Sequence, residues 1–99
     1  MNAMRPIHPG EVLKGELSEI GMRANAFAQA LNVPTNRITA ILKSARSITA
    51  DTALRFSHFF GTTPEFWLNL QSSYDLKVTR SSIGKKVEHE VRSLVECRP

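Results

Sequence analysis

Two groups of side chains in this sequence are reactive or charged enough to suggest a function. The first group does not have the spacing of a metal site or a catalytic site. It consists of three histidines and one cysteine. The histidines are scattered, with no pair at the spacing of a metal site, and Cys97 has no partner cysteine and no base that the sequence assigns to it. We therefore expect no enzyme, no catalytic residue, and no metal or other cofactor. The histidines are His8, His58 and His89.

The second group is basic and is concentrated in one segment. Four of the 13 basic residues lie between Ile20 and Ala50, where there is no Asp or Glu, and the rest equal the nine acidic residues in number. The net charge of +4 therefore belongs to this segment, which predicts a local patch that attracts polyanions such as nucleic acid. A solvated basic surface without a ligand is the alternative that charge alone leaves open. The four residues are Arg23, Arg37, Lys43 and Arg46.

Two short helices with an abrupt break between them carry this patch. Apolar residues from Ala24 to Leu31 repeat with helical period, and the period restarts at Ile38. Between the two runs, Asn32 tolerates positive φ and Pro34 would interrupt a continuous helix. Two short helices joined by such a turn are typical of a helix-turn-helix motif. The break therefore predicts a helix that projects at an angle to its partner.

The projecting helix has a narrow polar side that fits a DNA groove. With Ile38 and Ile41 pointing inward, the opposite side is slim, and a major groove ~12 Å wide admits it. Asn36 lies in the first turn, where its amide could bridge the N6/N7 edge of adenine, while peripheral cations could contact phosphates. The roles of the two threonines and of Arg37, base or backbone, stay open. The predicted DNA-binding residues are Arg23, Thr35, Asn36, Arg37, Thr39, Lys43 and Arg46.

Helical patterns continue on both sides of this motif. Start and stop signals predict one helix over Pro9–Gly21 and another over Thr49–Gly61. A fifth helix begins at Pro64, and a loose connection at Thr79–Gly84 leads to a short amphipathic helix that reaches Val95. No segment alternates like a strand. The apolar residues expected on buried helix faces include Ile20 and Leu54.

These elements predict an all-α protein with one small domain, as its 99 residues suggest. We place the helix-turn-helix domain at residues 1–80, with the motif at about 23–43. Residues 81–99 would form a C-terminal helical extension associated with dimerisation.

The fifth helix carries more apolar side chains than one small core is expected to bury. They cover more than one side of the helix, and the C-terminal segment adds another stripe. We therefore predict a homodimer whose interface includes Tyr74, Leu76 and Val78. Such a dimer would place two recognition helices in successive major grooves ~34 Å apart, so the operator should be an inverted repeat.

Nothing in the sequence indicates a membrane protein. It has no apolar run of 18 residues, and its first residues lack the apolar stretch of a signal peptide. A single cysteine suits a reducing compartment. We expect a cytoplasmic protein without a membrane partner.

Three stretches of the chain resemble the HigA antitoxin family, the VapI-type members of the Xre, phage-repressor-like helix-turn-helix group. They are HPGEVLKGEL, ALNVPTNRITAIL and ITADTALRFSHFFGTTPEFWLNLQSSYDL. The resemblance covers roughly Ile7–Leu76 and extends more faintly to about Val95. Two positions depart from the family pattern: Asn32 stands where glycine is usual, and Arg23-Ala24 stands where many members have Ser-Gln.

The resemblance implies a five-helix, phage-repressor-like helix-turn-helix domain with a short C-terminal helix, folded throughout. It also implies a dimeric repressor of its own operon that binds double-stranded operator DNA. The implied protein partner is a HigB-like toxin, an RNase of the RelE type that cuts messenger RNA on the ribosome. We expect the toxin to bind away from the recognition helix, on the first helix and the N-terminal arm. A stand-alone Xre-type repressor without a toxin is the alternative.

Overall fold

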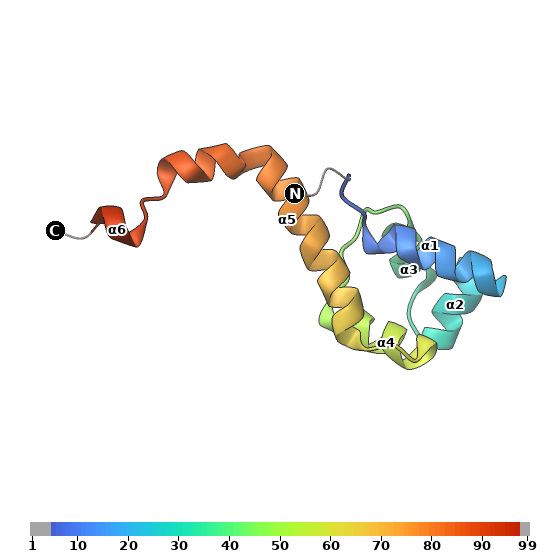
Figure 1. Ribbon diagram of the computed structural model, residues 1–99. Coiled ribbons are helices and arrows are strands. Elements are labelled where there is room, and N and C mark those ends of the chain that lie inside the picture. Colours follow the sequence, from blue (N-terminus) through green and yellow to red (C-terminus); the bar gives the residue numbers. More distant parts are fainter. Residues whose placement is uncertain (1–4, 98–99) are drawn as a thin grey trace.

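The computed structural model describes residues 5–97, so the outermost parts of the predicted domain and extension, residues 1–4 and 98–99, lie outside the described residues. Within residues 5–97 the chain is all-helical, which confirms the predicted fold class. The first helices pack into a compact body, from which the last part of the chain projects (Figure 1). The helices are α1 (Pro9–Ile20), α2 (Ala24–Leu31), α3 (Thr35–Leu42), α4 (Ala50–Phe60), α5 (Pro64–Glu90) and α6 (Leu94–Cys97).

The predicted helix ends are confirmed for the elements of the body. α1 and α4 end at Gly21 and Gly61, which have φ values of 65° and 76°. This left-handed conformation favours glycine because it has no side chain. At the start of α4 and α5, the hydroxyls of Thr49 and Thr63 accept hydrogen bonds from the amides of Thr52 and Phe66. Local signals thus set these ends.

The core of the body is built around aromatic rings. Phe56 lies between Phe27 and Trp67, with ring centroids 5.3 Å and 5.0 Å away. All three side chains are fully buried, and Trp67 donates its indole N–H to the hydroxyl of Thr62 at 3.1 Å. α2, α4 and α5 therefore share one core.

Two apolar residues expected in the core lie outside it. Ile20 is 52% exposed and Leu54 is 59% exposed. Each has the right helical period, but Ile20 is the last residue of α1 and Leu54 borders an open groove along α4. The expectation of burial was therefore wrong at both positions, because period assigns a face and does not show whether another element covers it.

The loose connection predicted at Thr79–Gly84 is also wrong, because α5 runs through it without interruption. Ser81, Ser82 and Gly84 are weak helix formers, but propensity is only a weak prior. No proline interrupts this stretch, and Lys86 and Glu90 form an i,i+4 pair at 3.9 Å. The ribbon of α5 changes direction in its orange part (Figure 1). The predicted division at residue 80 thus falls inside a helix.

The C-terminal part gives the molecule an elongated shape. The radius of gyration is 17.3 Å, compared with about 13 Å for a compact chain of this length. The short C-terminal helix predicted from Ile83 to Val95 is not formed as such: residues 83–90 belong to α5, and a separate α6 begins only at Leu94. None of the helices in residues 5–97 combines the length and apolarity that a membrane crossing requires.

Candidate nucleic-acid interface

The turn between α2 and α3 has the geometry that the sequence predicts. Asn32 has φ 59° and ψ 49°, and its amide donates to the carbonyl of Gln29 at 3.1 Å. The amide of Val33 donates to the carbonyl of Ala28 at 3.0 Å. Pro34 follows with φ −63° and precedes the first residue of α3. Asn32 therefore replaces glycine without loss of the helix-ending hydrogen bonds.

α3 is held against the body through its apolar side. Ile38 and Ile41 are fully buried, as predicted. Gly10 of α1 lies against the backbone of Ile41, and a Cβ atom added there would come within 1.9 Å of the carbonyl oxygen of Ile41. α1 and α3 thus approach at backbone contact distance. The sequence gives no local signal for this role, since Gly10 reads as an ordinary residue of a first helical turn.

The outward side of α3 is polar and accessible. Thr35, Asn36 and Lys43 are exposed, and Thr39 and Ala40 are partly buried. The hydroxyl of Thr39 donates to the backbone carbonyl of Asn36 at 3.3 Å. Within residues 5–97 the side-chain amide of Asn36 has no hydrogen-bond partner, so both its donor and its acceptor are available to a base edge.

Three of the four cations of the basic segment are exposed and unpaired within residues 5–97. Arg23 precedes α2 and makes no capping hydrogen bond with its side chain. Lys43 ends α3, and Arg46 lies in the loop that follows. All three are exposed, and none forms an ion pair with a residue in the part of the chain that the structure describes. Their charges are therefore available to an anionic ligand.

Arg37, the fourth cation, is arranged differently. Its guanidinium Nη1 donates to Asp51 Oδ2 at 2.7 Å, and its side chain is only 25% exposed. Asp51 lies one residue beyond the acid-free segment, so sequence spacing suggested four available cations where the structure has three. Arg37 was left open between base and backbone, and in this structure it points to Asp51.

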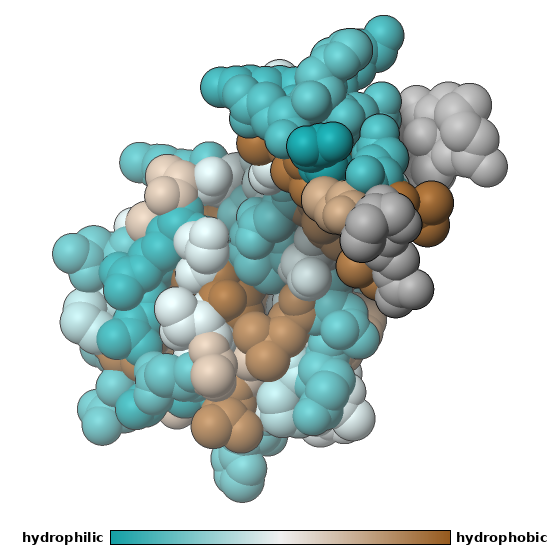
Figure 2. All heavy atoms as spheres, turned by 90° about the vertical axis from the view of Figure 1, so that its left-hand side faces the viewer, coloured by the Kyte–Doolittle hydropathy of each residue, from teal (hydrophilic) through white to brown (hydrophobic). Residues whose placement is uncertain are grey.

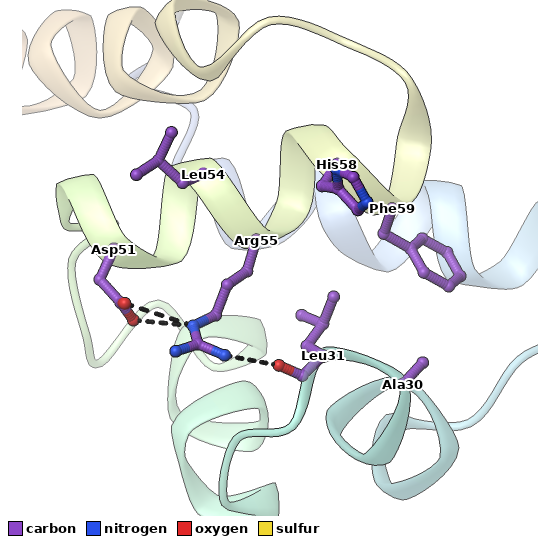
Figure 3. A pocket seen from close by; sticks show the side chains of 7 residues that line it. All are labelled: Ala30, Leu31, Asp51, Leu54, Arg55, His58 and Phe59. Carbon is purple, nitrogen blue, oxygen red and sulfur yellow. Dashed lines mark hydrogen bonds and ion pairs between the residues drawn. The ribbon is translucent and has the colours of Figure 1, made fainter.

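The carboxylate of Asp51 also connects to α2 through Arg55. Arg55 Nε donates to both oxygens of Asp51, at 3.1 Å and 3.3 Å, and its Nη1 donates to the carbonyl oxygen of Leu31 at 2.8 Å (Figure 3). Hydrogen bonds from Arg55 and then Arg37 lower the pKa of Asp51 below its ordinary 3.8. The spacing of Asp51 and Arg55 suits an i,i+4 pair, whereas their links to α2 and α3 have no sequence signal.

The three predicted interface residues of α5 differ in their surroundings. Tyr74 is partly buried, and its ring lies edge-on to that of His8 with centroids 4.9 Å apart. Leu76 is 55% exposed and Val78 is 40% exposed. Residues two positions apart on a helix are separated by about 200° around its axis. The side chains of Leu76 and Val78 therefore point to nearly opposite sides of α5. One flat partner surface could not cover both.

The chain is similar to proteins with related names and with the same fold. It is 50% identical over 78 residues to virulence-associated protein I of Dichelobacter nodosus, covering 78% of this chain and 72% of that one. It is 63% identical to an addiction module antidote protein of the HigA family from Coxiella burnetii, with a TM-score of 0.89 over 91% of this chain and 99% of that structure. The chain belongs to the HigA family. No protein-family model matches it.

Another HigA structure includes DNA. The Pseudomonas aeruginosa antitoxin HigA, solved with the higBA promoter, is 43% identical with a TM-score of 0.87 over 91% of this chain and 99% of that one. The resemblance to HigA antitoxins that three sequence stretches suggested is therefore confirmed.

One histidine of this HigA-family chain has a structural role that spacing did not reveal. His8 is 2% exposed, and its Nδ1 accepts a hydrogen bond from the amide of Gly10 at 2.9 Å at the start of α1. Glu11 completes a capping box by accepting from the amide of His8. Burial lowers the pKa of His8 below its ordinary 6.5, although the carboxylates of Asp75 and Glu11 act in the opposite direction. A neutral imidazole thus connects α1 to α5.

Proposed function

We propose that this chain is a dimeric repressor of its own operon and the antitoxin of a HigB-like toxin that cleaves messenger RNA. Its DNA ligand is a double-stranded operator with an inverted repeat. It acts in the cytoplasm by binding, and it is not an enzyme.

The outward face of α3 is the observation that carries the DNA-binding part of this proposal. The unpaired amide of Asn36 lies in the first turn, where helix-turn-helix proteins reach base edges. Lys43 and Arg46 lie at the border of that face, where phosphates run. The similarity to a HigA antitoxin solved with promoter DNA supports the same docking here.

The direct test is a binding titration with two DNA duplexes. One duplex covers the promoter of the chain's own gene, and the other has the same base composition in shuffled order. We expect the promoter duplex to bind more tightly, with affinity for both duplexes falling as salt rises because phosphate contacts release counterions. Equal affinity for the two duplexes would contradict a sequence-specific repressor.

Dimerisation is supported by the apolar residues that the body leaves uncovered. No described residue after Gln71 is buried, and we call residues 76–97 the C-terminal arm. Figure 2 looks toward this arm and shows brown apolar side chains among the teal ones. The exposed apolar residues of the arm are Leu76, Val78, Ile83, Val87, Val91, Leu94 and Val95.

Toxin binding rests on the family and on the position of α1. α1 packs behind α3 through the Gly10–Ile41 contact, so its outer side is separate from the recognition face. We propose that the toxin binds this side of α1 and the chain preceding it, which leaves α3 available to DNA. Substitution of Asn36 or Lys43 should therefore leave toxin binding intact.

The toxin assignment is tested by co-expression with the product of the neighbouring open reading frame. A small basic RelE-like protein that co-purifies with this chain, and whose RNA cleavage it stops, supports an antitoxin. If no such gene or complex exists, the stand-alone Xre-type repressor replaces that part of the proposal.

A further inference from the structure

An acidic residue beside the DNA-reading helix needs a physical reason, because it repels the phosphates that its neighbours would attract. Asp51 is that residue. Its side chain is 54% exposed, and its carboxylate joins Arg37 in the first turn of α3 to Arg55 of α4. Asp51 lies in the first turn of α4, where an acid is favourable to the helix dipole. That effect would favour any acid in this turn, and exposed ion pairs contribute little to folding stability, so neither explains why the carboxylate contacts Arg37.

The contacts of Arg37 show what Asp51 does instead. Arg37 directly follows Asn36 in the chain, so its side chain leaves the backbone of α3 beside the proposed base-reading residue. Asp51 is the one carboxylate within ion-pair distance of Arg37 in residues 5–97, and the buried Nε of Arg37 has no partner there. The direction of the guanidinium therefore depends on a single acceptor.

The acceptor is itself held in place. Arg55 donates to both carboxylate oxygens of Asp51 and is anchored by its hydrogen bond to the carbonyl of Leu31 at the end of α2 (Figure 3). Asp51 thus lies between two arginines, one of which is tied to the helix that precedes the turn. This arrangement fixes the carboxylate before DNA arrives.

We propose that Asp51 is a specificity-determining positioning residue that restrains Arg37 from the DNA backbone. A released Arg37 would add a phosphate contact to every sequence alike, which raises non-specific affinity without improving the readout by Asn36. Specificity is a difference between affinities, so restraining an indiscriminate contact increases it. This inference rests on the proposed DNA-binding function.

The test is a double-mutant cycle with Asp51→Asn and Arg37→Gln, measured as the slope of log affinity against log salt on the shuffled duplex. In Asp51→Asn we expect the slope to steepen by about 0.9 for each subunit, the value for one phosphate contact, and therefore by about 1.8 for a bound dimer. Adding Arg37→Gln to that variant should remove the increase, whereas Arg37→Gln alone should leave the wild-type slope unchanged. The ratio of promoter to shuffled affinity should fall in Asp51→Asn.

Two controls separate this restraint from simpler effects. Asp51→Glu keeps a carboxylate and should retain the wild-type slope. Glu65→Gln removes the same charge from the first turn of α5, outside the proposed interface, and should also leave the slope unchanged. If Asp51→Asn does not fold, Arg37→Gln alone still decides, because a slope reduced by about 0.9 per subunit would show that Arg37 already contacts phosphate.

The outcomes distinguish this inference from the function on which it rests. An unchanged slope in Asp51→Asn, or an increase that persists without Arg37, overturns the restraint and leaves DNA binding standing. Equal wild-type affinity for both duplexes rejects sequence-specific repression, while the slopes on shuffled DNA still test the restraint. Absence of binding to either duplex rejects both.

Discussion

Asn36 and Lys43 lie at the two ends of the outward face of α3, and we expect them to affect DNA binding in different ways. Replacing Asn36 with alanine removes a base contact and should cost ~1–3 kcal/mol per half-site while relaxing preference at one base position. Replacing Lys43 with alanine should weaken binding to all sequences alike and reduce the salt slope by about one for each phosphate contact removed. Salt titrations with promoter and shuffled duplexes measure both. An unchanged promoter-to-shuffled ratio in Asn36→Ala would show that the base-reading assignment is wrong.

Two glycines of α1 allow a matched test of how closely α1 packs against α3. A Cβ at Gly10 would collide with the carbonyl of Ile41, whereas a Cβ at Gly15 has nothing within 4 Å. Gly10→Ala should therefore lower the free energy of unfolding by about 1–3 kcal/mol, the usual range for overpacking. Gly15→Ala should raise it by roughly 0.5–1 kcal/mol, because alanine favours a helix interior. Urea denaturation of both variants tests this, and equal effects would contradict the close contact of α1 and α3.

At the scale of elements, we expect His8 at the start of α1 to make the free energy of unfolding depend on pH. The folded-state pKa of His8 lies below its ordinary 6.5 because of burial, so the unfolded chain takes up the proton first as pH falls. Stability is therefore complete above about pH 6.5 and is lost as pH falls from there toward the folded-state pKa. In His8→Asn, which keeps a capping side chain, this loss between about pH 7.5 and 5.5 should be smaller. His58→Asn, at an exposed histidine, is the control and should behave like the wild type.

Glu11, at the same helix start, should cause a second loss of stability at lower pH. Its hydrogen bonds with Arg5 and with the amide of His8 lower its pKa from 4.5 to about 2. Its contribution is therefore present above about pH 4.5 and is lost as pH falls toward 2. Thermal unfolding of Glu11→Gln should show a smaller loss of melting temperature across this range than the wild type. A loss equal to that of the wild type would mean that the capping box does not titrate as described.

At the scale of the whole molecule, the C-terminal arm explains why a single copy is incomplete. Leu76, Ile83 and Val87 lie on one side of α5 and line a shallow groove there, whereas Tyr74 continues the side that faces the body. An isolated helical arm with an uncovered apolar stripe has little stability of its own in water. We expect a second copy to cover the stripe and to supply the missing contacts.

Sedimentation of variants in the arm tests the dimer. Wild type should sediment at twice the monomer mass of 11.1 kDa, and Ile83→Glu should shift it toward the monomer by placing a charge in the stripe. Ser81→Glu adds the same charge about 160° away around the helix and should leave the dimer intact. A wild-type monomer at tens of micromolar, or equal effects of both variants, would contradict this interface.

Much of the fold could be predicted from local signals in the sequence. Helix period, the threonine caps and the glycines that end α1 and α4 act over a few residues, so they can be read without knowing what packs against them. The same holds for the turn at Asn32, whose φ of 59° is one that Asn tolerates better than most other residues with a side chain. The outward position of Asn36 then follows from the buried side of α3.

Tertiary structure alone decided the contacts between residues that are far apart in the chain. The pairing of Arg37 with Asp51, the approach of Gly10 to Ile41 and the burial of His8 against Tyr74 each depend on how helices cross. Spacing within a sequence assigns a side chain to a face, but it does not encode the crossing angle that brings two faces together. The sequence therefore determined the helices of the body and the outward residues of α3, while the packing of those helices determined which cations remain available to DNA.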